Sequence, residues 1–266
     1  MGNFLRRCIF HCISMKIQYC SDLHLEFQEN ADFLENNPLK PVGEVLLLAG
    51  DAVPFTQMQK HPAFFDFVSD SFKWVYWLPG NHEYYHFDIA NKSGSLNEKI
   101  RDNVFLVNNH TVQHQQVRFI FSTLWSKISS HRELKIQRGM SDFHAIKLNG
   151  KRFTAVDYNK LHLESKDFIS NTLLQRSDGK TVVVTHHVPT FRKYPQQYLG
   201  DVLNEAFAVE LEGLIEASNA DYWIYGHHHQ HIPEFEIGST KLITNQLGYV
   251  RYNEHIGFRG DSTFVL

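Results

Sequence analysis

The hydrophobic residues of this chain form short continuous runs, and each run ends at a group of polar side chains. Five runs of four to six residues are rich in Val, Ile, Leu, Tyr and Trp, and Asp, Asn or His follows each of them closely. A continuous apolar run of this length is typical of a strand that is buried on both faces. The pattern therefore predicts strands over 16–20, 44–49, 74–77, 181–185 and 222–225.

Longer stretches between these runs predict the remaining elements. Residues 26–43 are polar and contain Pro38 and Pro41, which indicates an irregular loop. Strands that alternate with helices along a chain indicate an α/β fold. We expect helices over 54–72, 87–102, 157–176 and 205–217, further strands over 104–107, 111–115 and 117–123, and closing strands within 233–266.

The polar groups that follow the five strands are residues that bind metals. Because ligands of an open α/β sheet bind at the carboxyl ends of its strands, we expect these side chains to converge. Carboxylate, imidazole and amide ligands suit Mn, Fe or Zn. In Asp-x-His and His-x-His, an extended backbone would direct both side chains the same way. In chain order the residues are Asp22 and His24, Asp51, Asn81 and His82, His186, and His227 and His229.

The series Asp-x-His, Gly-Asp, Gly-Asn-His-Glu, His and Gly-His-x-His resembles the calcineurin-like metallophosphoesterase superfamily, with motifs that span residues 22–229. The resemblance implies an α/β fold, a four-layer α/β/β/α sandwich that carries two metal ions. It implies that His82 is the catalytic histidine and not a ligand. It places Asp22, His24, Asp51 and His229 at one metal and Asp51, Asn81, His186 and His227 at the other, with Asp51 bridging both.

The resemblance also implies a reaction. It indicates a phosphoesterase that cleaves a monoester, diester or pyrophosphate bond through a hydroxide held between two divalent or mixed-valence ions of Mn, Fe or Zn, with His82 as general acid. Residues 50–54 lack the tyrosine of purple acid phosphatases and the Asp-Arg-Gly run of protein serine/threonine phosphatases. A small-molecule or nucleotide phosphoester is then the expected partner. The alternative is a non-catalytic scaffold, although such relatives lose ligands that are all present here.

The composition of the chain restricts which other classes of protein it can belong to. The chain has 266 residues and 42% apolar content, which is enough for the core of one large domain. We expect residues 15–266 to form this single domain. The net charge of -3 gives no overall attraction to nucleic acid or an anionic membrane, so nucleic acid is the second choice of partner. No run of 18 apolar residues occurs, which argues against a membrane helix. Cys8, Cys12 and Cys20 suit reduced thiols in the cytoplasm, and the oligomeric state is left open.

Two segments and several neighbours of the motifs have other expected roles. Residues 1–14 do not continue the first strand, so we expect a dispensable extension. Residues 125–160, the cap segment, hold eight Lys and Arg against three acids, which favours either a solvated loop or a cap that contacts phosphate.

Strand alternation points His187 and His228 away from the ligands, toward supporting or surface roles. Glu83 is a candidate for orienting a ligand or the catalytic histidine.

Overall fold

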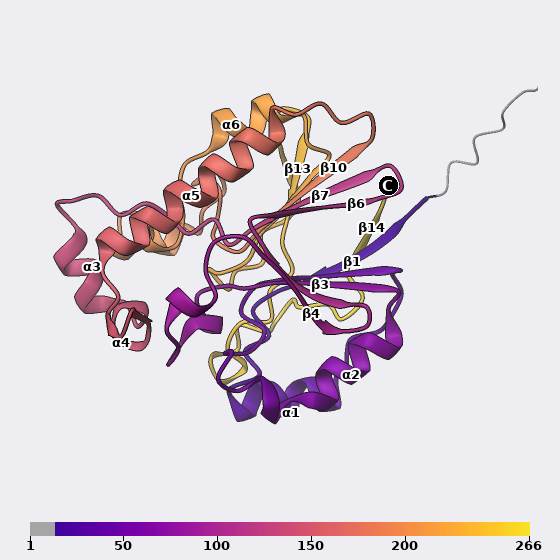
Figure 1. The fold of residues 1–266 in the computed structure, drawn as a ribbon, viewed down its shortest axis with the longest axis horizontal. Coiled ribbons are helices and arrows are strands. Elements are labelled where there is room, and N and C mark those ends of the chain that lie inside the picture. The colour runs from indigo at the N-terminus through magenta and orange to yellow at the C-terminus, as the bar shows by residue number, and fades with distance from the viewer. Residues whose placement is uncertain (1–13) are drawn as a thin grey trace, which may run out of the picture.

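Two β-sheets lie face to face, and helices cover both of their outer surfaces (Figure 1). The computed structural model describes residues 14–266. The two sheets and their helices give the α/β/β/α arrangement and confirm the predicted fold class. Cys8, Cys12 and nearly all of the predicted extension over 1–14 lie outside the described residues.

The first sheet carries the first three metal-binding motifs of the sequence. Its strands are β1 (Lys16–Cys20), β2 (Val45–Ala49), β3 (Trp74–Leu78), β4 (Leu96–Arg101), β5 (Val104–Asn108) and β14 (Thr263–Val265). They lie in the order β14-β1-β2-β3-β5-β4. The four central strands are parallel, and β14 and β4 pair antiparallel at the edges. The carboxyl ends of β1, β2 and β3 therefore meet at one edge of the sheet.

The second sheet has the same plan and carries the histidine motifs. Its strands are β6 (His110–His114), β7 (Val117–Ser122), β10 (Lys180–Thr185), β11 (Tyr222–Ile224), β12 (Phe235–Ile237) and β13 (Thr240–Ile243). They lie in the order β12-β13-β11-β10-β7-β6, again with four parallel central strands and antiparallel edges. A separate hairpin joins β8 (Lys147–Leu148) to β9 (Lys151–Arg152).

Alternate residues of each central strand belong to different cores. In β2, Val45 and Leu47 face the second sheet, whereas Leu46 and Leu48 face the helices. In β10, Val182 and Val184 face the first sheet and Val183 faces the other way. Both faces of these strands are thus buried, which is why their sequences read as continuous apolar runs.

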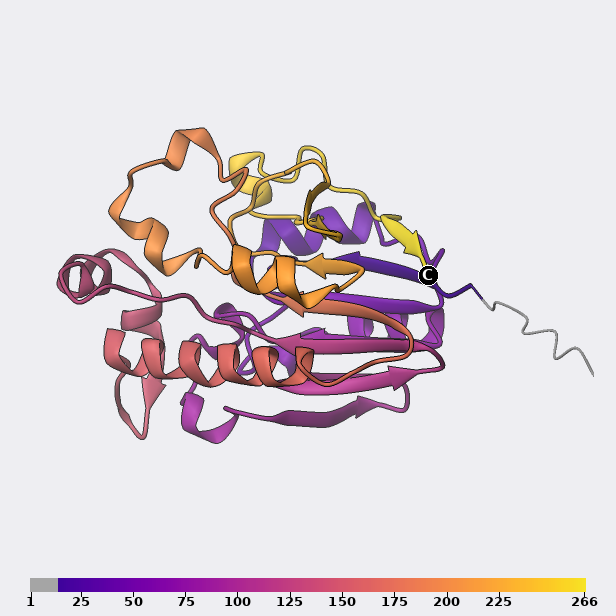
Figure 2. The ribbon, with the colours of Figure 1, turned by 90° about the horizontal axis from the view of Figure 1, so that it is seen from above.

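The helices lie in three places. Helices α1 (Gln28–Asn36) and α2 (Pro62–Ser71) cover the first sheet, and α5 (Ala155–Leu173) and α6 (Glu212–Ser218) cover the second (Figures 1 and 2). Helices α3 (Glu133–Gly139) and α4 (Asp142–Ala145) belong to the cap segment and lie beyond the carboxyl ends of the central strands (Figure 1). Helix α5 begins where Thr154 and Asp157 form a reciprocal capping box.

The structure corrects several predicted elements. The expected loop over 26–43 contains α1, whose buried Leu34 packs into the core before Pro38 and Pro41 exclude further helix. The expected helix over 87–102 is wrong: apart from a short 3₁₀ turn, that stretch holds β4, which pairs antiparallel with β5. Pairing with a neighbouring strand overrides the local preference of such a polar edge sequence.

The other predicted helices and strands agree more closely with the observed elements in their residue ranges. The helix expected over 54–72 is confined to α2, which begins at Pro62, and the helix over 157–176 is α5. The helix over 205–217 divides into the 3₁₀ turn η5 (Val202–Ala206) and α6. Strands β5, β6 and β7 match their predicted ranges, and β12, β13 and β14 supply the closing strands. Within residues 14–266, each helix is too short or too polar to cross a membrane.

Candidate metal centre

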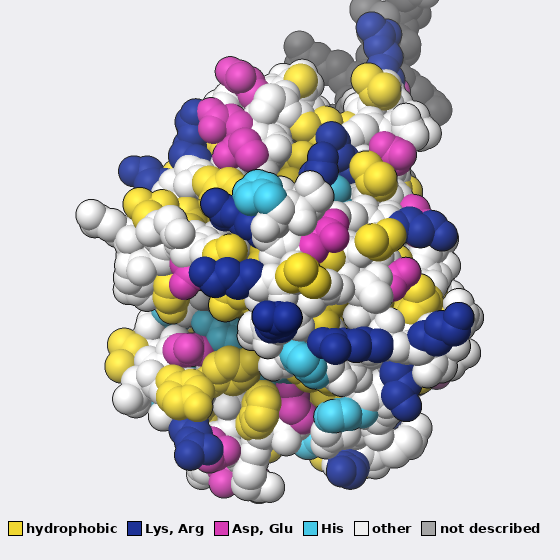
Figure 3. Space-filling model, turned by 90° about the vertical axis from the view of Figure 1, so that its left-hand side faces the viewer, with side chains coloured by type: hydrophobic (Ala, Val, Ile, Leu, Met, Phe, Trp, Pro, Cys, Tyr) yellow, Lys and Arg dark blue, Asp and Glu magenta, His cyan; other side chains and the backbone are white. Residues whose placement is uncertain are grey.

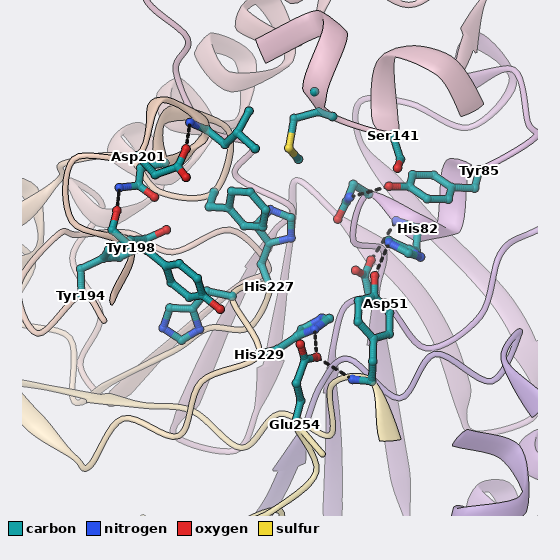
Figure 4. Close-up of a pocket in the computed structure, with 18 residues that line it drawn as sticks. Asp51, His82, Tyr85, Ser141, Tyr194, Tyr198, Asp201, His227, His229 and Glu254 are labelled. Atoms are coloured by element: carbon teal, nitrogen blue, oxygen red, sulfur yellow. Dashed lines mark hydrogen bonds and ion pairs between the residues drawn. The ribbon is translucent and has the colours of Figure 1, made fainter. Parts of the chain in front are cut away.

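The predicted ligands converge at the shared edge of the two sheets, as the motif pattern indicates. All seven residues follow strands β1, β2, β3, β10 and β11. Each is buried, or nearly so in the case of His229, whose side chain is 11% exposed. Figure 4 shows Asp51, His227 and His229 turned toward one region of a cavity. Segments more than 200 residues apart in the sequence therefore build one site.

The first group of side chains contains Asp22, His24 and His229. Nε2 of His24 lies 3.0 Å from Nε2 of His229. Nε2 of His229 lies 3.4 Å from Oδ1 of Asp22. Oδ2 of Asp51 is 3.8 Å from Nε2 of His24, at the boundary of the group. These three residues offer ligand atoms within 4.8 Å of one another.

The second group contains Asp51, Asn81, His186 and His227. Nε2 of His186 lies 3.3 Å from Oδ2 of Asp51 and 3.1 Å from Oδ1 of Asn81. The same nitrogen is 3.1 Å from Nδ1 of His227. Because Oδ2 of Asp51 faces both this group and His24, Asp51 occupies the position expected of a bridging carboxylate.

These separations fit metal ligation. Atoms that bind one ion at about 2.1 Å in tetrahedral or octahedral geometry lie roughly 3.0–3.4 Å apart, which is the spacing within both groups. Two imidazole nitrogens that face each other at 3.0 Å need a shared proton or a cation between them. The oxygen and nitrogen donors suit Mn, Fe or Zn, and thiolates are not needed.

Two histidines of the second group are oriented by backbone carbonyls. Nδ1 of His186 donates to the carbonyl of Ala49 at 3.0 Å, which leaves Nε2 as the lone-pair nitrogen facing the site. His227 uses the opposite arrangement, because its Nε2 donates to the carbonyl of Ala206 at 3.3 Å and Nδ1 faces the site. Such outer hydrogen bonds fix the tautomer that a metal requires.

The two histidines of the first group are oriented by carboxylates instead. Nδ1 of His24 donates to Glu26 at 3.2 Å, and Nδ1 of His229 donates to Glu254 at 2.7 Å. Although burial opposes the charged form, hydrogen bonds to Asp22 and Glu254 raise the pKa of His229 to about 10. The carboxylates around this imidazole therefore favour positive charge, as a site for a cation should.

His82 lies beside the metal groups and has its own partners. Its Nδ1 donates to Oε1 of Glu26 at 2.8 Å, and its Nε2 lies 3.2 Å from the hydroxyl of Tyr249. The ring stacks on Tyr85 at 4.0 Å. Burial lowers the pKa of His82, but Asp51 and Glu26 raise it above its ordinary value overall. A histidine held in this way suits proton transfer through Nε2.

The geometry also gives His82 a competing role. His24, Asp51 and His82 offer ligand atoms within 4.8 Å of one another, so this trio has metal-ligand spacing too. The assignment of His82 as an acid and not a ligand stays a prediction, and removing its imidazole separates the two roles.

The cap segment contributes an acid to the centre. Oδ1 of Asp142 accepts hydrogen bonds from Nδ2 of Asn81 at 2.9 Å and from the hydroxyl of Tyr85 at 2.7 Å. The amide nitrogen of Asn81 is thereby turned away, so its oxygen faces His186. Asp142 is fully buried, and this burial raises its pKa.

The basic residues of the cap segment lie elsewhere. Arg132 pairs with Glu205, and Nε of Arg152 donates to the carbonyl of Phe143. On the face that carries α3 and α4, Lys and Arg side chains are scattered over the surface among hydrophobic and acidic ones (Figure 3). Among the described residues, none of the eight Lys and Arg of the cap segment lines the cavities at the site.

Glu83 supports the backbone around the centre. Its two carboxylate oxygens accept hydrogen bonds from the N–H groups of Asp51, Ala52 and Gly80 and from the indole of Trp77, at 2.7–2.9 Å. The structure shows no side-chain hydrogen bond from Glu83 to His82. Glu83 therefore ties the end of β2 to the end of β3 and positions Asp51 through its main chain.

The backbone at the ligands differs from the expected extended form. Asp22, His24, Asp51, His227 and His229 have φ angles between 48° and 79°, in the left-handed region. Such a conformation costs a non-glycine residue about 1–2 kcal/mol. The side chains of Asp-x-His and His-x-His converge because the chain turns sharply after each strand, and the prediction from simple alternation was wrong on this point.

Of the supporting or surface roles expected for His187 and His228, the structure shows buried, supporting positions. Neither belongs to a group with metal-ligand spacing. His187 is fully buried against Trp125 and His227, with Nδ1 facing the carbonyl of Thr123. Nδ1 of His228 accepts a hydrogen bond from Gln246 at 2.9 Å.

Four residues that contact the expected ligands or His82 were not predicted from the sequence. Glu26 continues the alternation of Asp22 and His24, and this spacing is the one signal that would have identified it. Asp142, Tyr249 and Glu254 carry no comparable pattern, because each reaches the centre only through the folded chain.

Glycine precedes three of the ligands for a steric reason. A Cβ atom at Gly50 would lie 2.2 Å from Nδ1 of His186, and one at Gly226 would lie 2.6 Å from Oδ2 of Asp22. At Gly80 the nearest atom would be Oδ1 of Asp51, at 2.1 Å. Each motif therefore needs glycine because a ligand from another strand occupies the space that a side chain would fill.

Replacing Gly80 by alanine should disrupt the centre. The added methyl group would displace Asp51 and His186, so we expect loss of bound metal and a fall in activity of more than about 100-fold. Gly213→Ala in α6 is the matched control, because its Cβ would meet no atom within 4 Å and alanine favours a helix by up to about 1 kcal/mol. Metal analysis and thermal unfolding measure both variants. Full metal content in Gly80→Ala would contradict the steric argument.

The comparisons agree with this arrangement. Two facing sheets with Asp, Asn and His side chains at their common edge define a fold of the metallophosphoesterase type. The model of the calcineurin-like phosphoesterase family matches residues 15–231, and the chain belongs to this family. The match confirms the resemblance read from the motifs.

Individual relatives extend the comparison. The uncharacterized protein L509 of Acanthamoeba polyphaga mimivirus is 32% identical over 259 residues, which covers 88% of this chain and 91% of that protein. The phosphopantetheinyl hydrolase PptH of Mycobacterium tuberculosis has a similar structure, with a TM-score of 0.69, 16% identity and coverage of 94% and 95%. A dimetal phosphatase from Danio rerio gives a TM-score of 0.48 at 12% identity over 87% of each chain. PptH thus shares the fold.

Proposed function

We propose that this protein is a dinuclear metal-dependent phosphoesterase. The observation that supports this most directly is that all seven expected ligands face one another at ligand spacing, with histidine tautomers set by outer hydrogen bonds. Asp22, His24, Asp51 and His229 would hold one ion, and Asp51, Asn81, His186 and His227 the other. Mn, Fe and Zn are the candidate metals.

The metal ligands and His82 would have different roles in hydrolysis. When bound, the two ions would neutralise charge on the phosphate oxygens and lower the pKa of water. Glu26 holds the Nδ1–H of His82, so Nε2 is the atom that would give a proton to the departing oxygen. The hydroxyl of Tyr249, 3.2 Å from Nε2, shows that an oxygen atom fits at hydrogen-bonding distance there.

We also propose a small-molecule phosphoester as the partner in preference to nucleic acid, since the chain carries a net charge of -3. The cysteine content supports a cytoplasmic location. A non-catalytic scaffold is the other candidate, and the complete ligand set argues against it.

Metal reconstitution tests this function. Protein stripped with a chelator and reloaded with Mn, Fe or Zn should bind about two ions per chain and hydrolyse a chromogenic phosphoester, while the stripped protein should not. Binding is measured by metal analysis and turnover by absorbance. Two bound ions without turnover of any monoester, diester or pyrophosphate would favour the scaffold.

A further inference from the structure

One cavity contains side chains of the metal centre, and a second cavity lies across a ridge from it. The first, of about 370 Å³, is lined by Asp51 and His82, and the second, of about 510 Å³, is lined by Glu26, the partner of His82. Their common wall consists of Tyr85 and the ridge, residues 139–141 at the end of α3. Both volumes are in the range of small-molecule sites. A group bound at the metal centre would therefore have room for one substituent in the first cavity, and a second substituent would reach the other cavity across the ridge.

The first cavity extends away from the centre toward aromatic residues. Figure 4 shows Tyr194, Tyr198 and Asp201 across the cavity from Asp51 and His82. Gly139 of the ridge faces Leu203 of η5, so this side of the cavity lies between α3 and η5. On this side the lining combines aromatic and apolar side chains, such as Tyr198 and Leu203, with the polar Asp201 and Asn204.

The second cavity lies on the other side of the ridge. Phe27, Pro54 and Gln57 line it together with His144 from α4. Gln57 is half-buried and lines only this cavity, so a larger side chain there would fill it without touching the predicted ligands.

The charge of both cavities restricts what they bind. Among the described residues, neither cavity is lined by Lys or Arg, whereas Asp201 and Glu254 line the first and Glu26 the second. Phosphate groups outside a metal centre are normally held by Lys, Arg or backbone N–H groups. A second phosphate, or the extra charge of a phosphomonoester, would have no Lys or Arg side chain of either cavity to pair with.

We propose that the substrate is a phosphodiester with two uncharged substituents, one in each cavity. This inference rests on the proposed phosphoesterase function. A phosphodiester carries one negative charge and two ester arms, which matches a centre that opens into one cavity, a second cavity across the ridge, and no Lys or Arg among the described residues that line either. Hydrolysis adds water to phosphorus and breaks one P–O bond. The leaving oxygen receives a proton and departs as an alcohol, and a phosphomonoester and one further proton remain.

Three nitrophenyl esters with the same leaving group separate charge from cavity filling. They are p-nitrophenyl phosphate, methyl p-nitrophenyl phosphate and phenyl p-nitrophenyl phosphate. On metal-loaded protein, the phenyl diester should exceed the methyl diester in kcat/KM by about 10-fold, because only phenyl fills the remaining cavity. The phenyl diester should also exceed the monoester, since it lacks the second charge.

A pair of variants tests the second cavity directly. Gln57→Trp should reduce the preference for phenyl over methyl diester by about 10-fold, because the indole occupies the space of the phenyl group. Gln59→Trp is the matched control: Gln59 is exposed two residues away and lines neither cavity, so the preference should persist.

Other results would overturn the inference. Equal kcat/KM for phenyl and methyl diesters, a preference for the monoester, or equal effects of the two Trp variants would show that the second cavity binds no ester arm. Turnover of the monoester alone would leave the proposed function intact and remove only the diester inference. No turnover of any ester by protein with two bound ions would overturn both.

Discussion

Replacing Asp51 by asparagine is expected to remove both bound metal and activity. Oδ2 of Asp51 faces His24 at 3.8 Å and His186 at 3.3 Å, so one carboxylate serves both groups. A neutral amide cannot supply the negative charge that two cations share. We expect less than the full pair of ions and a fall in kcat/KM of more than about 100-fold, since even residues behind the ligands affect metal sites by 10- to 100-fold.

The structure offers a matched control for this variant. Asp102 has a fully exposed side chain that pairs only with Lys99, so Asp102→Asn should change neither metal content nor activity. The N–H of His82 donates to Oδ1 of Asp51, so this carboxylate also supports the local turn. Circular dichroism should therefore be used to establish that Asp51→Asn is folded. Two tightly bound ions in folded Asp51→Asn would refute the bridging assignment.

Replacing His82 by alanine should affect esters according to their leaving groups. If Nε2 of His82 protonates the departing oxygen, its loss should reduce turnover of an alkyl phosphoester by about 10²- to 10⁴-fold. A p-nitrophenolate is acidic and leaves with little protonation, so the nitrophenyl ester should lose much less. Both ions should stay bound, because the motifs do not make His82 one of the seven expected ligands.

The measurement is made at saturating metal with both esters. His131→Ala is the control, because His131 is exposed and lines neither cavity at the site. Equal losses on the two esters would indicate that His82 positions the phosphate. Loss of an ion would instead make His82 a ligand together with His24 and Asp51, whose atoms lie within reach.

The family match ends before several residues that complete the centre. Residues 232–266 lie beyond the matched range of 15–231, yet Glu254 orients His229 and Tyr249 contacts His82. The N–H of His229 also donates to Gln246 at 2.6 Å. Side chains from residues 232–266 thus orient members of the first group and contact His82.

The sequence alone determined the central strands that carry the motifs and which of the expected ligands converge. Runs such as 44–49 and 181–185 are apolar throughout because both faces of each central strand are buried, and this signal is local. Each ligand directly follows its strand, so the common edge brought Asp22, Asp51 and His186 together as expected. The class of fold and the convergence of the expected ligands could therefore be predicted before any geometry was known.

The tertiary structure decided the features that depend on contacts between distant segments, namely strand β4 and the orientation of side chains at the centre. Strand β4 forms because β5 offers it hydrogen bonds, although its own residues do not indicate a strand. Which nitrogen of His229 faces the site is set by Glu254, and which atom of Asn81 does so is set by Asp142. Periodicity describes a residue's own element and carries no information about hydrogen-bond partners from other elements. Orientation at the centre is fixed by such partners, so only the folded chain determines it.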